Sequence, residues 1–162
     1  MWKDGLLNLV KELQPCILVT HSFSGMFALT IPELESYIKG LILISSAPNK
    51  GWMLELANST KHYNLPDLSS SLKEFYKNPV DENLKNIFYA TKAYLFLPHE
   101  IEKGNVILET TPFNGKSRMW ADLNFHPIYE HKWIPQTLPT LIIGSKDDRL
   151  LPSKLMEQQK GF

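Results

Sequence analysis

A chain of 162 residues is long enough for one domain with a sizeable hydrophobic core and short for two. Hydrophobic residues make up 43% and aromatic residues 11% of the chain, which is enough apolar surface to offset the entropy of ordering, so we expect a globular protein. Lys and Arg together number 17, as do Asp and Glu, and no basic run exceeds two residues, which argues against a nucleic-acid partner.

Cysteine usage and the absence of targeting signals bear on the compartment. Cys16 is the only cysteine, which excludes an internal disulfide framework and fits a reducing environment. The first residues contain no apolar stretch followed by a small-residue cleavage site, and nowhere do about 18 apolar residues follow one another. We therefore expect a cytoplasmic protein with no membrane span.

The first two predicted elements are a helix and a strand. Apolar residues recur every three or four positions over residues 2–13, at Trp2, Leu6, Leu7, Val10 and Leu13, which predicts an amphipathic helix that ends before Pro15. Residues 16–20, CILVT, form a short apolar run without alternation. That pattern is typical of a strand covered on both faces in a parallel sheet.

The next elements predict a parallel sheet interrupted by helices. Residues 24–29 begin a second helix that cannot continue past Pro32, and residues 40–48, GLILISSAP, repeat the buried-strand pattern. A strand, a helix and a strand in this order indicate a right-handed βαβ unit. The pattern is then helical until a third apolar run at residues 138–145, LPTLIIGS. We expect a core part over 1–48, a helical insertion over 49–118, and a return to the core over 119–162.

The turn between the first strand and the second helix, THSFSG, contains Ser22, a candidate nucleophile. A serine attacks a carbonyl only when a base takes its proton and donors receive the oxyanion. A sharp strand-to-helix turn favours both, but it needs small residues two positions before and two after the nucleophile. Thr20 and Ser24 occupy these positions, with Gly25 next, so the strict G-x-S-x-G pattern fails and a relaxed one holds. The alternative is a serine-rich loop in which Ser22 caps the helix.

Three segments resemble the α/β-hydrolase family. ILVTHSFSGMFAL resembles the nucleophile elbow, GLILISSAP resembles the next strand, which leads into the lid, and LPTLIIGSKDDRLLP resembles the later strand whose end carries the triad acid. They occur in the family's order, with a helical segment of family-like length between the last two. The resemblance covers essentially the whole chain, and it implies an α/β fold with a partial hydrolase core and a helical lid.

The resemblance also implies roles for individual residues. Ser22 would be the nucleophile, and the backbone N–H of Phe23 would supply half of the oxyanion hole. Asp147 lies at the common distance from Gly144, whereas Asp148 begins Asp-Arg-Leu-Leu-Pro, which resembles the frequent Asp-Arg-x-x-Pro form. We favour Asp148 as the acid. Without the elbow upstream, the two aspartates would be read as a solvated charge cluster.

The triad histidine has no candidate at the expected place. The family's order is Ser, acid, His, yet residues 149–162 contain no histidine. All five histidines precede the acid: His21, His62, His99, His126 and His131. His21 points elsewhere by strand alternation, and the others lie in or near the expected lid. The family's first strands are also missing, so we expect an internal piece of a longer α/β-hydrolase that is inactive and aggregation-prone when made alone.

The function expected from these features is that of a serine hydrolase acting on an ester, an amide or a related acyl compound of small size. No metal or cofactor is implied, because the histidines lack ligand spacing and a single cysteine cannot form a thiolate cluster. The alternatives are a non-catalytic relative that binds a ligand or a partner, and a fragment without chemistry of its own. The bond cleaved and the oligomeric state stay open, since the fold does not decide among them.

Overall fold

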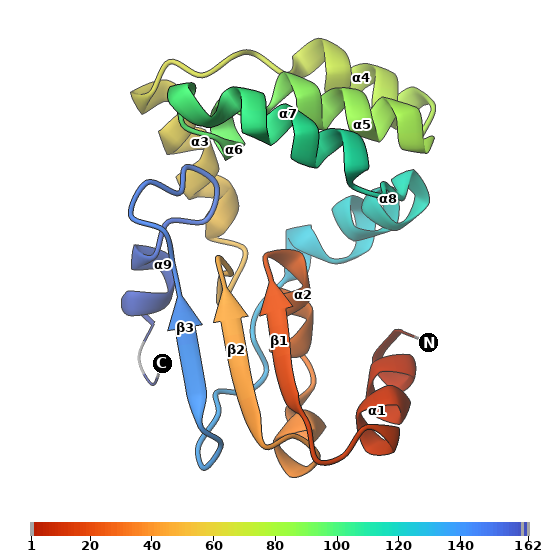
Figure 1. The fold of residues 1–162 in the computed structure, drawn as a ribbon, viewed down its shortest axis with the longest axis vertical. Coiled ribbons are helices and arrows are strands. Elements are labelled where there is room, and N and C mark those ends of the chain that lie inside the picture. The colour runs from red at the N-terminus through yellow and green to blue at the C-terminus, as the bar shows by residue number, and fades with distance from the viewer. Residues whose placement is uncertain (1, 160, 162) are drawn as a thin grey trace. The chain divides into compact units, whose positions relative to one another are not determined.

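The computed structural model describes residues 2–159 and residue 161. The chain forms two compact units, which are described separately (Figure 1). The sheet unit comprises the residues up to Met53 and those from Tyr129 onward, and the helical unit comprises Leu54–Ile128. Within the described part of the chain, no helix has the length and apolar character needed to cross a membrane.

Three parallel strands form the centre of the sheet unit. They are β1 (Ile17–His21), β2 (Gly40–Ile44) and β3 (Thr140–Ile143), in the spatial order β1-β2-β3. In the register, Val19 lies opposite Ile42, and Ile42 lies opposite Leu141. The expected α/β class with a parallel sheet is confirmed. β2 and β3 fall within the second and third apolar runs of the sequence, and β1 overlaps the first run but extends one residue further, to His21.

The helices of the sheet unit pack against one face of this sheet. They are α1 (Trp2–Glu12), α2 (Phe23–Ala28), the 3-10 helix η1 (Pro32–Ser36) and α9 (Lys154–Glu157). The core that they share with the strands contains Leu7, Val10, Ala28, Leu29, Ile31, Leu34, Ile38, Leu41, Leu43, Trp133 and Met156. The indole N–H of Trp133 donates to the carbonyl oxygen of Ala28 at 2.9 Å, which fixes the returning chain against α2. The expected final helix is present as α9, while Lys160 and Phe162 lie outside the described residues.

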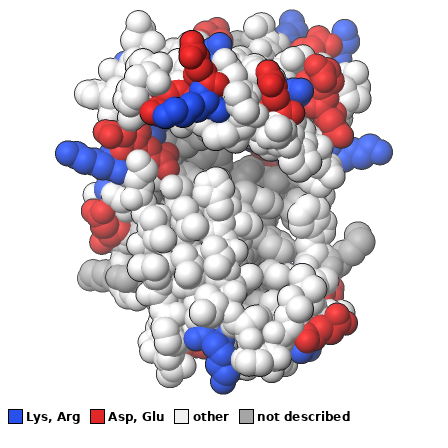
Figure 2. All heavy atoms as spheres, viewed as in Figure 1, with Lys and Arg blue, Asp and Glu red and all other residues white. Residues whose placement is uncertain are grey.

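The opposite face of the sheet is exposed. Ile17 and Val19 in β1 are 62% and 57% exposed, and Leu141 in β3 is 53% exposed. Figure 2, drawn from this side, shows an area over the strands with few charged side chains. The apolar pattern of β1 is typical of a strand covered on both faces, but in the described chain one face is uncovered, as expected of only three strands, because the helices that pack on this sheet share the other face.

The helical unit begins within α3 (Trp52–His62). It continues through α4 (Ser69–Lys77), α5 (Asp81–Ala90), α6 (Lys92–Leu95), η2 (Pro98–Glu100), α7 (Ile101–Thr110), α8 (Gly115–Asn124) and η3 (His126–Ile128). Phe75, Leu84 and Ile87 form its small buried core. The N–H of Gly115 at the start of α8 donates to the Asp81 carboxylate at 2.8 Å, which satisfies one of the open donors of that helix.

The chain leaves the sheet and returns to it at adjacent points. Asn49 and Glu130 form an isolated antiparallel bridge, and the N–H of Lys50 donates to the carbonyl oxygen of Tyr129 at 2.9 Å. The hydroxyl of Tyr129 donates to the carbonyl oxygen of Ala47 at 2.7 Å. Burial raises the pKa of the Tyr129 phenol well above its ordinary value, so this donor keeps its proton at physiological pH. The insertion between β2 and β3 is thus closed at its base within the sheet unit.

Candidate active site

Ser22 joins β1 to α2 in an unusual backbone conformation. Its φ is 55° and its ψ is −125°, a region that residues with a side chain rarely adopt. Such a conformation persists only where the surrounding structure holds it, and such residues cluster at functional sites. Although Ser22 stands at the N-cap position, its side chain makes no capping hydrogen bond to α2. The cap-serine alternative is therefore not the role of this side chain in the structure.

The backbone of Ser22 is bonded on both sides. Its N–H donates to the carbonyl oxygen of Ile44 at 2.9 Å, which ties the turn to the end of β2. Its carbonyl oxygen accepts from the N–H groups of Gly25 and Met26, at 3.0 and 3.3 Å, and from the hydroxyl of Ser46 at 3.1 Å. These four bonds hold the conformation that sends the chain abruptly from the strand into the helix.

The two residues that depart from the glycine pattern, Thr20 and Ser24, are both accommodated. Thr20 is buried, and its hydroxyl donates to the carbonyl oxygen of Ile42 across the sheet at 3.0 Å. The hydroxyl of Ser24 accepts from the N–H of His21 at 2.9 Å and donates to the carbonyl oxygen of the same residue at 2.8 Å. Each of the two hydroxyls thus has a backbone hydrogen-bond partner.

Gly25 is the position that requires glycine. A Cβ added there would lie 2.5 Å from the Oγ of Ser46, 2.9 Å from its Cβ and 3.2 Å from the Oγ1 of Thr20. The first distance is shorter than real Cβ contacts show, so α2 approaches the end of β2 only because this residue has no side chain. The sequence places small residues at Thr20, Ser24 and Gly25, and the structure shows that Gly25 is the one at which a side chain does not fit.

The two candidate acids follow β3 and differ in their surroundings. Asp148 is half-buried, and its Oδ1 accepts the N–H groups of Leu150 and Leu151 at 2.9 and 2.8 Å. Asp147 is exposed, and its backbone N–H donates to the hydroxyl oxygen of Ser145 at 3.4 Å. Two backbone donors on one oxygen fix the orientation of the Asp148 carboxylate, so Asp148 is the better held of the two.

Ser22 and Asp148 belong to the same edge of the sheet. Because all three strands are parallel, their carboxyl ends lie together, as Figure 1 shows for the three arrowheads. Parallel strands lie about 4.8 Å apart, so the first and the third strand are separated by roughly 10 Å. Ligand sites in open α/β sheets also lie at this edge.

Neither histidine of the sheet unit is placed as the base. His21 lies on the exposed face of β1, in register with Ile44. His131 is on the returning segment, with its Nδ1 3.1 Å from the carbonyl oxygen of Pro48. The helical unit contains His62, His99 and His126. We assign none of these five rings to the site.

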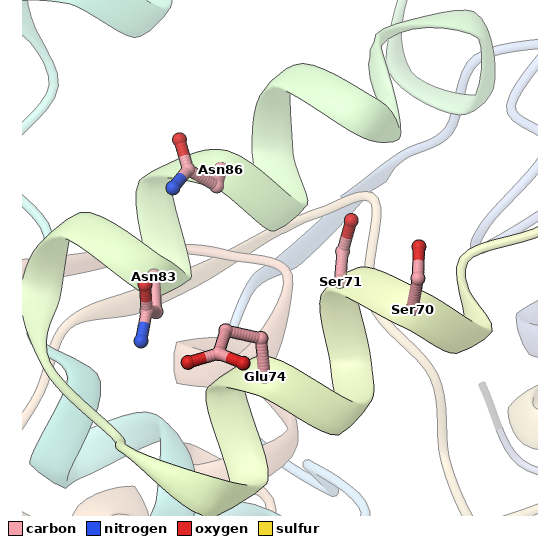
Figure 3. Close-up of a pocket in the computed structure, with 5 residues that line it drawn as sticks. All are labelled: Ser70, Ser71, Glu74, Asn83 and Asn86. Carbon is pink, nitrogen blue, oxygen red and sulfur yellow. The ribbon is translucent and has the colours of Figure 1, made fainter.

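The surface has two hollows that neither Ser22 nor Asp148 lines. One, of about 240 Å³, lies between α4 and α5 and is lined by Ser70, Ser71, Glu74, Asn83 and Asn86 (Figure 3). The other, of about 440 Å³, lies beside β3 and α9 and is lined by Ile142, Gly144, Lys146, Ser153, Met156 and Glu157. Among the described residues, no group of three or more His, Cys, Asp and Glu side chains could hold a metal ion.

Ser46 is the contributor to the site that sequence reasoning missed. It is 4% exposed and bonds to a carbonyl 24 positions earlier in the chain. The only signal was the serine pair at the end of the second apolar run, in LISSAP, which also occurs in ordinary loops. The contact depends on strand pairing, which a local pattern does not specify.

Comparison with known proteins adds no relative: no family model, no curated protein and no solved structure matches the chain.

Proposed function

We propose that this chain carries the nucleophile and the acid of a serine hydrolase of the α/β-hydrolase type. The conformation of Ser22 is the observation that supports this most strongly. A serine at positive φ between a parallel strand and a helix, with a hydroxyl that does not cap that helix, is arranged as a nucleophile elbow requires. The resemblance of the three sequence segments agrees with this assignment.

In the proposed reaction, the Oγ of Ser22 attacks the acyl carbon of an ester, an amide or a related compound. A histidine takes the hydroxyl proton and passes it to the leaving group as the acyl–oxygen or acyl–nitrogen bond breaks. Asp148 orients that histidine and stabilises the charged form of the imidazole. The Asp148 carboxylate is suited to this role because two backbone N–H groups fix its orientation. Water then releases the acyl group from Ser22. The Phe23 N–H stabilises the oxyanion in both steps.

The family's order assigns the histidine to sequence beyond the acid strand, and we propose that the complete protein supplies it there. We also propose that the helical unit, inserted between β2 and β3, is the segment that corresponds to the family's lid. In this interpretation the sheet unit supplies the chemistry.

Labelling with a fluorophosphonate probe tests the proposal. The protein is expressed from its complete natural reading frame, treated with the probe, and digested for mass spectrometry. We expect the label on Ser22, no label in Ser22→Ala, and unchanged labelling in Ser70→Ala, which removes an exposed serine of the helical unit. Absence of label from the folded protein, or label on another residue, would overturn the assignment of Ser22 as the nucleophile.

A further inference from the structure

Ser46 contacts the backbone of Ser22, and this contact has no role in the reaction proposed above. Its side chain is buried at the end of β2, and its hydroxyl donates to the carbonyl oxygen of Ser22 at 3.1 Å. The bond does not serve the β2 ladder, since Ser46 lies beyond the last paired residue, Ile44. It joins the second strand directly to the residue proposed as nucleophile.

The approach of Ser46 is built into the neighbouring helix. Gly25 leaves the space that the Ser46 hydroxyl fills, and an added Cβ would lie only 2.5 Å from that oxygen. Thr20 lies against the same spot, 3.2 Å from the same added Cβ, and its own hydroxyl is already bonded to Ile42. The Ser46 hydroxyl is thus confined beside Gly25, close to the turn.

The bonded carbonyl belongs to the peptide group that links Ser22 to Phe23. This group is planar and trans, so its C=O and its N–H point in opposite directions and turn together. Whatever holds the Ser22 oxygen therefore also sets the direction of the Phe23 N–H. The Gly25 and Met26 donors approach that oxygen from α2, and Ser46 approaches it from β2.

We propose that Ser46 is a positioning residue for the oxyanion hole. By holding the Ser22 carbonyl, it aims the Phe23 N–H at the oxygen that becomes negative during acyl transfer. This inference rests on the proposed function, since it concerns the same site. It predicts a role in the transition state rather than in binding of the substrate, because the charge on that oxygen develops only there.

The expected effect is smaller than loss of an oxyanion donor. Removing one such donor costs about 100- to 1,000-fold in kcat. Ser46→Ala keeps the Phe23 N–H and the two helix donors to the Ser22 carbonyl. The Phe23 N–H is therefore still present, but its direction is less firmly fixed. We expect kcat to fall by about 5- to 30-fold, a fraction of the loss of a complete donor, with KM within twofold of the wild type.

The test compares variants of the complete protein with a p-nitrophenyl ester. The side chains of threonine and valine have the same shape, but only threonine carries a hydroxyl. Ser46→Thr should therefore retain most of the wild-type kcat, and Ser46→Val should behave like Ser46→Ala. Ser45→Ala is the matched control, because it changes the adjacent, half-buried serine, whose backbone N–H donates to the carbonyl oxygen of Ile143 at 2.8 Å and is kept in the variant. Affinity for a trifluoromethyl ketone, which forms an oxyanion at the serine, should fall in parallel with kcat/KM. Melting temperatures show whether each variant is folded.

The outcomes separate this inference from the proposed function. If Ser22→Ala abolishes hydrolysis while folded Ser46→Ala and Ser46→Val keep kcat within twofold, only the positioning role is overturned. The positioning role is also overturned if Ser46→Thr and Ser46→Val lower kcat equally. The loss is then caused by the changed shape of the side chain and not by the missing hydroxyl. If Ser22→Ala hydrolyses the ester as well as the wild type does, the proposed function itself fails.

Discussion

The turn at Ser22 illustrates how hydroxyl-bearing side chains can replace glycine where the local backbone supplies partners. Thr20 departs most from the expected small residue, yet its hydroxyl bonds to Ile42 and its bulk lies in the core. Ser24 folds back onto His21. The sequence predicted the place of Ser22 between a strand and a helix, but not its positive φ, because that angle depends on bonds to β2, which is distant in sequence.

Asp148 is expected to be the acid on which activity depends. Asp148→Asn keeps an oxygen able to accept from Leu150 and Leu151 but removes the charge that stabilises a protonated histidine. We expect kcat/KM to fall by about 10³- to 10⁴-fold, as for loss of charge in other triads. Steady-state hydrolysis by the complete protein measures this effect.

The neighbouring aspartate provides the matched control. Asp147→Asn removes the same charge from an exposed position one residue earlier, and its kcat/KM should stay within about twofold, as expected of a surface charge. A larger loss in Asp147→Asn than in Asp148→Asn would reverse the assignment of the acid.

At the level of elements, the strands were predictable because buried parallel strands have nearly continuous apolar sequences. The helical unit was predictable as helical from its periodicity, but its internal contacts were not. Asp81, for example, holds the start of α8 through the N–H of Gly115, which lies 34 residues further along the chain. The sequence shows only an acidic residue and a glycine at those positions.

The junction of α8 and η3 should make the stability of the fold depend on pH. His126 is buried there, with its Nε2 3.8 Å from Asp122, which also accepts from the Nε of Arg118 at 2.8 Å. Burial is the main cause that lowers the pKa of His126. The positive charge of Arg118 lowers this pKa further, whereas the negative charge of Asp122 raises it. The unfolded chain, with its ordinary His pKa of about 6.5, then binds the proton more readily than the folded chain.

Stability should therefore fall as the pH drops below about 6.5, and it should be fully present above that value. Thermal unfolding followed by circular dichroism, from about pH 7.5 to about pH 5.5, measures this dependence. His126→Gln should flatten the curve relative to the wild type. A steeper fall in His126→Gln would contradict the assignment.

For the molecule as a whole, the exposed apolar face of the sheet is the main departure from an ordinary parallel sheet. Sheets of this kind are normally covered on both faces, and uncovered apolar surface promotes association. The 162-residue chain should therefore bind the dye ANS, and Val19→Lys should reduce that binding. Because Val19 is 57% exposed, the free energy of unfolding should change by only about 0.5 kcal/mol.

Leu43→Lys is the contrasting variant, since Leu43 lies in the next strand on the covered face and is fully buried. Burying its ammonium group should lower the free energy of unfolding by several times as much, about 3 kcal/mol or more. Urea unfolding compares the two. Equal losses in Val19→Lys and Leu43→Lys would mean that the face with Val19 is covered in this chain.

The bridge between Asn49 and Glu130 has a consequence for how the protein can change over evolution and in the laboratory. Since the two ends of the insertion are held side by side by bonds within the sheet unit, the path from β2 to β3 can be shortened without separating the strands. Insertions whose ends lie close together are the ones most readily exchanged between proteins. We therefore expect that a short turn after Lys50 can replace the helical unit while the turn at Ser22 keeps its bonds to β2.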